Sequence, residues 1–168
     1  DEVANCRQFA LLLKWEAEAL GAQFHFNCDI APLSRTAPTS LSLASGSEAL
    51  RFDAVIVCAG LASATLLRPL GLRIPLAPVY GHSVSAPVRE PLNAPRSAVM
   101  DERYKVAISR LGQRVRVAGS AEIGGSLDTM NPAAIQTLYK VLHDWFPGAA
   151  TLQSGVQQWK GARPMLPD

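Results

Sequence analysis

Apolar residues near the start of the chain follow first a helical and then a strand pattern. Spacing by three and four residues predicts a helix over residues 3–20, and Gly21 is its expected left-handed stop. The apolar positions of this helix are Phe9, Leu12, Leu13, Ala17 and Leu20. Apolar and polar residues then alternate over 23–30, which predicts a strand. A helix, a glycine and a strand in this order are typical of a parallel α/β unit.

The next stretch combines two short alternating segments with one continuous apolar run. Residues 40–44 and 49–52 predict a small antiparallel hairpin around residues 45–47. Residues 53–60, Asp-Ala-Val-Ile-Val-Cys-Ala-Gly, are mostly small or β-branched, which predicts a strand buried on both faces of a parallel sheet. A short helix is expected over 61–70, closed by Gly71.

Beyond residue 72 the pattern changes to short extended pieces separated by prolines, which predicts an antiparallel sheet. Arginines and valines alternate over 114–118, so one face of this sheet is expected to be wet. A turn is expected at 111–113. The expected strands are 78–88, 96–100, 104–109 and 114–122.

A second helix is expected over 133–145, with Asn131 as its N-cap and Pro132 in its first turn. An extended stretch over 152–160 follows. The apolar face of the helix is Ile135, Leu138, Val141, Leu142 and Trp145. The predicted fold class is therefore α/β plus α+β, divided into domains 1–72 and 73–168.

Composition changes this picture little. Hydrophobic residues make up 48% of the chain and charged residues 18%, as in ordinary globular proteins. A net charge of +2 is too small to favour nucleic acid, so no nucleic-acid partner is expected. The apolar runs fall far short of the roughly 20 residues that span a bilayer. Cys6, Cys28 and Cys58 are widely spaced, which favours buried thiols over a disulfide framework or a metal site.

Two segments carry the best candidates for chemistry. The pair Ala59-Gly60 ends the predicted buried strand, where small residues let a ligand approach the backbone, although such an ending can equally pack against a helix. Arg163 lies just before Pro164 in an apolar setting, which suits bidentate binding of a carboxylate, with a structural salt bridge as the equal alternative.

Other polar residues favour ordinary structural roles. His25, His82 and His143 lie in different predicted elements, so each is expected at the surface or as a satisfied core residue. Adjacent Asp101 and Glu102 point apart on a strand or turn, which disfavours a carboxylate pair. Five basic residues crowd one hairpin and predict a solvated sheet face, with an anion-binding surface as the alternative. They are Arg103, Lys105, Arg110, Arg114 and Arg116.

Four segments together resemble the FAD-dependent D-amino-acid oxidase-like superfamily, and most closely the catalytic small subunits of bacterial D-amino-acid dehydrogenases. These segments are 53–60, 78–83 (Pro-Val-Tyr-Gly-His-Ser), 101–123 and the motif Trp-Lys-Gly-Ala-Arg-Pro-Met-Leu-Pro-Asp over 159–168. The chain departs from the family at Tyr80, His82 and Ala162, which affects the expected substrate preference more than the fold.

The resemblance implies an enzyme that transfers the α-hydrogen of a D-amino acid as hydride to FAD, giving a keto acid and ammonia after hydrolysis. Arg163 matches the arginine that binds the substrate carboxylate, and Tyr104 matches a substrate-side tyrosine. We expect Ala59, Gly60 and Ile30 to contact FAD. Electrons would pass to a membrane respiratory acceptor, which implies a cytoplasmic location peripheral to the inner membrane.

The family's Gly-x-Gly-x-x-Gly fingerprint is absent from this sequence. We therefore expect an internal fragment, with the rear of an FAD-binding Rossmann-like domain over 1–72 and a substrate-binding domain, incomplete at its C-terminal end, over 73–168. Such a fragment is expected to bind FAD weakly or not at all, to be inactive alone and to self-associate. The alternatives are a glycine or sarcosine oxidase-like amine oxidase, and a non-catalytic binding or assembly module.

Overall fold

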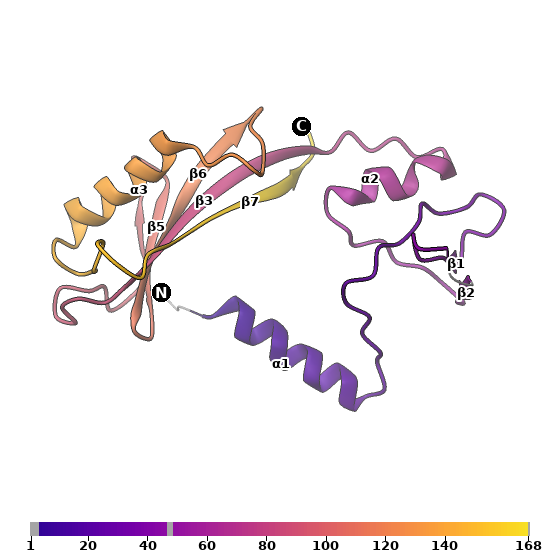
Figure 1. The fold of residues 1–168 in the computed structure, drawn as a ribbon, viewed down its shortest axis with the longest axis horizontal. Coiled ribbons are helices and arrows are strands. Elements are labelled where there is room, and N and C mark those ends of the chain that lie inside the picture. Colours follow the sequence, from indigo (N-terminus) through magenta and orange to yellow (C-terminus); the bar gives the residue numbers. More distant parts are fainter. Residues whose placement is uncertain (1–3, 47–48, 168) are drawn as a thin grey trace. The chain divides into compact units, whose positions relative to one another are not determined.

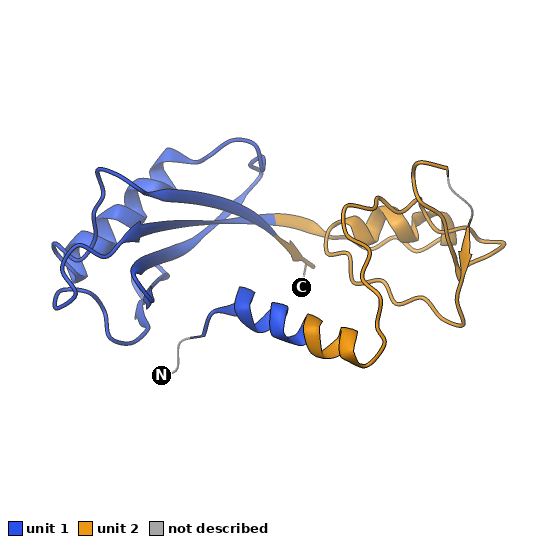
Figure 2. Ribbon diagram, turned by 60° about the horizontal axis from the view of Figure 1, so that its bottom comes forward, with its two compact units in different colours: residues 1–13, 79–162 blue, residues 14–78, 163–168 orange. Residues whose placement is uncertain are grey.

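The computed structural model describes residues 4–46 and 49–167, which divide into two compact units (Figure 2). Unit 1 contains the described residues up to Leu13 together with residues 79–162. Unit 2 contains residues 14–78 and the described residues from Arg163 onward. The domain boundary at residue 72, taken from the change in sequence pattern, stays a prediction.

A five-stranded sheet forms the framework of unit 1 (Figure 1). The strand order β4-β5-β6-β3-β7 places β4 and β7 at the two edges. The pairs β4–β5, β5–β6 and β6–β3 are antiparallel, as the sequence predicts. The strands are β3 Ala77–Pro87, β4 Val99–Asp101, β5 Val106–Leu111, β6 Arg114–Ile123 and β7 Gln157–Met165.

Helix α3, Pro132–Trp145, packs on one face of this sheet (Figure 1). The alternation over 114–118 is confirmed: the valines of β6 are buried beneath α3, whereas Arg114 and Arg116 are only partly buried. Each such aliphatic side chain stabilises the fold by about 1.5–3 kcal/mol when fully buried. The core of strands and helix comprises Val84, Val106, Ile108, Val115, Val117, Ile135, Leu138, Val141 and Leu142.

The bounds and the N-cap of α3 are as predicted, but the burial of its last residue is not. Asn131 is the N-cap, and its side-chain oxygen accepts hydrogen bonds from the amides of Ala133 and Ala134. Trp145 was expected on the buried face, but it is 53% exposed. Its indole nitrogen donates a hydrogen bond to Asp101 at 2.7 Å, which holds the ring at the edge of the core.

Helix α1, Cys6–Ala19, confirms the first predicted helix, and Gly21 follows it with φ +94°. The expected burial of its apolar face is wrong, because no residue of α1 is buried. Phe9 and Leu12, for example, are 60% and 54% exposed. None of the described helices is long and apolar enough to cross a membrane.

The two strands predicted over 23–30 and 53–60 do not form within the described chain. Ile30 makes only an isolated bridge to Leu43, and Ile56 is 87% exposed. A strand needs a neighbour for its backbone hydrogen bonds, and no described segment forms a ladder with 53–60. The predicted parallel sheet is therefore not present among these residues, and the elements that form are helices and antiparallel sheets.

The remaining elements of unit 2 agree with the sequence in a shorter form. Strands β1, Ser40–Leu41, and β2, Leu50–Arg51, pair antiparallel. Helix α2, Ala62–Leu67, continues as the 3₁₀ turn η1, Arg68–Leu70. All three cysteines are exposed, so their expected burial is wrong. Cys58 is exposed because segment 53–60 does not join a sheet, so no other element packs on its two faces.

Candidate functional site

The three residues expected to contact FAD come together in unit 2. Ile30 and Ala59 line the same hollow, about 250 Å³ in volume, and Gly60 is the next residue along the chain. The other lining residues are aliphatic or small: Leu33, Leu41, Val55, Ile56, Val57, Cys58 and Leu66. The result is an apolar recess bounded on one side by a segment that ends in small residues.

Gly60 also lies close to the segment that contains Arg163. A Cβ atom placed on Gly60 would stand 3.9 Å from Cγ of Pro164, the residue after Arg163. Gly60 has φ +56°, a conformation that residues with side chains rarely adopt. The fold therefore places the end of segment 53–60 next to the Arg-Pro dipeptide, although more than 100 residues separate them in the sequence.

Arg163 lies near the end of β7, and its side chain is exposed. Pro164 after it has no backbone donor and restricts the backbone of Arg163 to extended conformations. Within a regular strand, residues an odd number of positions apart point to opposite faces, so Arg163 and Lys160 use different faces of β7. An exposed guanidinium on an extended backbone can offer two parallel donors to a carboxylate.

Tyr104 belongs to unit 1, in the turn between β4 and β5. Its backbone amide donates to Asp101 Oδ1 at 2.9 Å, and its ring lies 5.4 Å from the ammonium of Lys140 on α3. Hydrogen bonds from the Trp145 indole and from the Tyr104 amide lower the pKa of Asp101. These contacts hold Tyr104 against α3, and the structure groups it with the sheet core rather than with the Gly60 segment.

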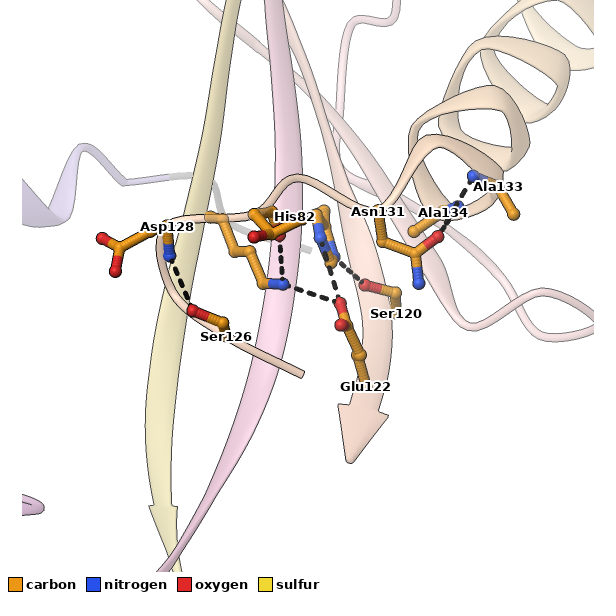
Figure 3. Close-up of polar contacts among 10 residues, drawn as sticks. His82, Ser120, Glu122, Ser126, Asp128, Asn131, Ala133 and Ala134 are labelled. Carbon is orange, nitrogen blue, oxygen red and sulfur yellow. Dashed lines mark hydrogen bonds and ion pairs between the residues drawn. The ribbon is translucent and has the colours of Figure 1, made fainter. Parts of the chain in front are cut away.

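A buried polar cluster in unit 1 was missed by the sequence analysis (Figure 3). His82 is 2% exposed, and its Nδ1 lies 2.8 Å from the Ser120 hydroxyl. Its Nε2 lies 3.4 Å from Glu122 Oε2, which in turn pairs with Lys160 Nζ at 2.9 Å. The Lys160 ammonium also donates to the carbonyl of Thr129 at 2.7 Å.

An irregularity in β6 makes this cluster possible. Tyr80 is paired with Glu122 but His82 with Gly119, so β6 has one more residue than β3 between these two pairs. Ser120 takes φ +69° within this bulge. A Cβ on Gly125 would collide with the Glu122 carboxylate where it now stands, so the loop after β6 lies directly against that side chain.

The charges of this cluster shift the pKa values of two members. Burial lowers the pKa of His82, and the nearby Lys160 cation lowers it further, against the opposing effect of Glu122. The hydrogen bond from Lys160 lowers the pKa of Glu122. At neutral pH the cluster therefore contains a neutral imidazole beside an ionised carboxylate–ammonium pair.

No motif in the sequence predicts that His82, Glu122 and Lys160 lie together. They lie on β3, β6 and β7, and only the strand order β6-β3-β7 makes them neighbours. His82 was expected to be a surface or satisfied core histidine. It is a core residue and its Nδ1 is hydrogen-bonded to Ser120, but its buried Nε2 has no hydrogen-bond partner among the described residues. One feature of the sequence could have indicated a buried lysine. Lys160 and Arg163 are three positions apart, so on a strand they point to opposite faces and only one of these charges can face solvent on the same side.

Comparison of the sequence with known families shows which class of protein has this fold and this recess. The family model described as FAD dependent oxidoreductase, DAO, matches residues 1–168. The chain belongs to this family of FAD-dependent oxidoreductases. It is 40% identical over its full length to the D-amino acid dehydrogenases of Rhizobium johnstonii and Bradyrhizobium diazoefficiens, and 39% identical to that of Vibrio cholerae.

Solved structures agree on the fold. The glycine oxidase of Geobacillus kaustophilus matches 94% of this chain with a TM-score of 0.76 at 20% identity. The iminodiacetate oxidase of Chelativorans matches 95% of it with a TM-score of 0.75 at 21% identity. The chain spans 40% of the length of the dehydrogenases named above, and 41% and 43% of these two oxidases.

The described residues fit part of an FAD site. An aliphatic recess suits one side of a flat ring system, and the ending Ala59-Gly60 lets a ligand approach the backbone. The glycine-rich turn that binds the pyrophosphate in dinucleotide folds is absent from the sequence. The described residues therefore fit one part of an FAD site, and the sequence contains no Gly-x-Gly-x-x-Gly phosphate-binding fingerprint.

Proposed function

We propose that this chain forms the substrate-binding part, and one wall of the flavin site, of an FAD-dependent dehydrogenase that oxidises D-amino acids to keto acids and ammonia. The Rossmann-like flavin domain of that enzyme would be completed by sequence that the dehydrogenases have beyond the matched 40% of their length. Alone, the 168 residues are expected to bind FAD weakly or not at all and to be inactive.

The proximity of Gly60 to Pro164 supports this proposal most directly. Gly60 is one of the residues expected to contact FAD, and Pro164 directly follows the arginine expected to bind the substrate, so their proximity agrees with a site in which flavin and substrate meet. The identity of 39–40% with D-amino acid dehydrogenases over the whole chain favours this substrate class.

In this proposal Arg163 binds the substrate carboxylate and fixes the orientation of the α-carbon. Ile30, Ala59 and Gly60 contact FAD, whose chemical contribution is to accept the hydride. Tyr104 contributes from the substrate side. Orientation of the reacting carbon accounts for most of the rate in such a site, so no acid–base pair is needed among these residues.

The same proposal includes the route of the electrons. In the dehydrogenase branch they pass to a membrane respiratory acceptor, which would place the complete protein in the cytoplasm at the inner membrane. Reduction of an artificial quinone without oxygen consumption would agree with this route.

A glycine or sarcosine oxidase-like activity is the second candidate. The fold resembles that of the glycine oxidase of Geobacillus kaustophilus, but at 20% identity this similarity supports the fold alone and does not favour this activity over the first candidate. A non-catalytic module is the third candidate, and it predicts no turnover of any amine.

A chimera tests the proposal directly. The 168 residues would replace the matching segment of the Rhizobium johnstonii dehydrogenase, and flavin absorbance would verify that the chimera binds FAD. We expect reduction of an artificial acceptor with D-alanine and much less with glycine or sarcosine. Arg163→Lys should lower kcat/KM for D-alanine about 10- to 100-fold, mainly through KM, because lysine cannot make the bidentate contact.

Arg89→Lys provides the matched control, since Arg89 is an exposed arginine outside the proposed site. It should leave kcat/KM unchanged. A flavin-loaded chimera that prefers glycine or sarcosine would support the second candidate. One that oxidises no amine would support the third.

A further inference from the structure

Strand β7 lies at an edge of the sheet and has an unusual anchor. Eight of its nine residues are exposed or half-buried, and the single buried one is a lysine, Lys160. An edge strand is normally held by apolar side chains on its inner face as well as by its backbone ladder. In β7 no apolar side chain is fully buried, so a charged group occupies the position of the hydrophobic anchor.

The Lys160 side chain, 2% exposed, is held by groups from three other parts of unit 1. Glu122 on β6 pairs with its ammonium, and Thr129 in the segment before α3 accepts a hydrogen bond from it. The ring of Tyr80 on β3 lies 4.7 Å from the same nitrogen. The lysine thus reaches from β7 across β3 to β6. Neighbouring strands lie about 4.8 Å apart, so its side chain spans two strand spacings.

We propose that Lys160 is a positioning residue that fixes β7 against β3 and β6 and thereby sets the place of Arg163, three residues further along the same strand. The positioning role rests on the proposed function of Arg163 as the carboxylate-binding residue. The anchoring role does not depend on that function.

The physical basis is the cost of leaving one half of a buried ion pair alone. An ammonium taken out of water requires its partners, and removal of one member of such a pair is more disruptive than replacement of both. Without the ammonium, Glu122, whose side chain is 19% exposed, would retain an unpaired negative charge beside His82, and β7 would lose its one buried side-chain anchor. Local opening of β7 should then become more frequent than opening of the sheet centre.

Hydrogen–deuterium exchange on the whole 168-residue chain tests the anchor without requiring catalysis. Peptides from β7 and from α3 would be compared in the wild type and in Lys160→Met. We expect the amides of β7 to exchange at least about tenfold faster in the variant, with much smaller changes in α3. Lys140→Met is the matched control, since Lys140 forms an exposed ion pair with Asp144. Lys140→Met should leave the rate of amide exchange in β7 unchanged.

Glu122→Gln provides a second, milder variant if Lys160→Met folds poorly. It removes the charge of the partner but leaves Lys160 its bond to Thr129, so β7 should again exchange faster than α3, by a smaller factor. Unchanged exchange of β7 in Lys160→Met, or equal acceleration of β7 and α3 in both variants, would overturn the anchor.

The carboxylate role of Arg163 is judged separately by the chimera. There, Lys160→Met should raise KM for D-alanine more than it lowers kcat if the anchor positions Arg163. Faster exchange of β7 together with an unchanged KM would retain the anchor and refute the positioning. A defective Arg163→Lys with normal β7 exchange in Lys160→Met would retain the proposed function and refute the anchor.

Discussion

At the scale of single residues, the protonation state of His82 depends on the groups around it. The same imidazole in water would be partly protonated near pH 6.5. Burial beside the Lys160 cation favours its neutral form, and the Ser120 hydroxyl engages Nδ1. The ionised Glu122 opposes this effect but does not outweigh it. The residue is therefore a source of pH-dependent stability.

We predict that the protein loses stability as the pH falls below about 6.5. In that range the unfolded chain binds a proton at this histidine and the folded chain does not, so the free energy of unfolding decreases toward the folded pKa. One proton limits the slope to about 1.4 kcal/mol per pH unit. Urea unfolding at pH 7.5, 6.0 and 5.0 would measure it, with His82→Gln as the non-titrating comparison.

The His82→Gln variant should not show the loss of stability between pH 6.5 and 5. The carboxyl groups of Asp101 and Glu122, whose pKa values are also lowered, contribute stability that is lost only below about pH 4.5. They therefore do not account for a loss between pH 6.5 and 5. Equal slopes for wild type and His82→Gln over this range would contradict the prediction.

At the scale of elements, two helices of equal length show the difference between amphipathicity and burial. Helices α1 and α3 both contain 14 residues with an apolar face. α3 buries four side chains against the sheet and is capped by Asn131, whereas α1 buries none. Because isolated helices of this length are marginal in water, α3 depends on its packing and its cap, while α1 has no comparable support among the described residues.

Removal of the N-cap should weaken α3 measurably. Asn131→Ala leaves the amides of Ala133 and Ala134 without their acceptor, and a lost cap costs about 1 kcal/mol. The midpoint of urea unfolding should fall accordingly. Asn131→Ser keeps an acceptor and should recover most of the loss. A midpoint unchanged in Asn131→Ala would show that the cap contributes nothing to stability.

Strand prediction succeeded or failed according to whether a partner strand is available. The pattern of residues 78–122 specified β3 to β6 because each of these strands has a partner that supplies its hydrogen bonds. β5 pairs with its sequence neighbours β4 and β6, and β6 also pairs with the more distant β3. Residues 53–60 have as strong a strand pattern, yet no segment within 4–46 and 49–167 pairs with them. Propensity determines which conformation a segment prefers, but a ladder requires a second backbone.

At the scale of the whole molecule, large apolar side chains remain in contact with water in both units. They include Phe9, Leu12, Trp15, Phe26 and Ile56, each more than 50% exposed. Exposed apolar surface of this extent is typical of an interaction surface or an aggregation-prone face. We expect the chain to cover such residues by self-association.

We predict that the isolated chain associates in solution. Its weight-average sedimentation coefficient should rise with concentration, because hydrophobic burial favours the associated form. Phe9→Gln combined with Leu12→Gln should reduce the rise, whereas Thr137→Gln, an exchange on the partly buried face of α3, should not. A constant monomer mass across a wide concentration range would contradict the prediction.

The sequence by itself determined the helices, the antiparallel strands of unit 1, the cap at Asn131 and the family to which the chain belongs. These features depend on local periodicity or on motifs that neighbouring residues define. Only the tertiary structure decided that Gly60 lies beside Pro164 and that Lys160 meets Glu122 and His82. Such contacts join residues from 38 to more than 100 positions apart, and only the pairing of strands and the packing of segments bring them within reach.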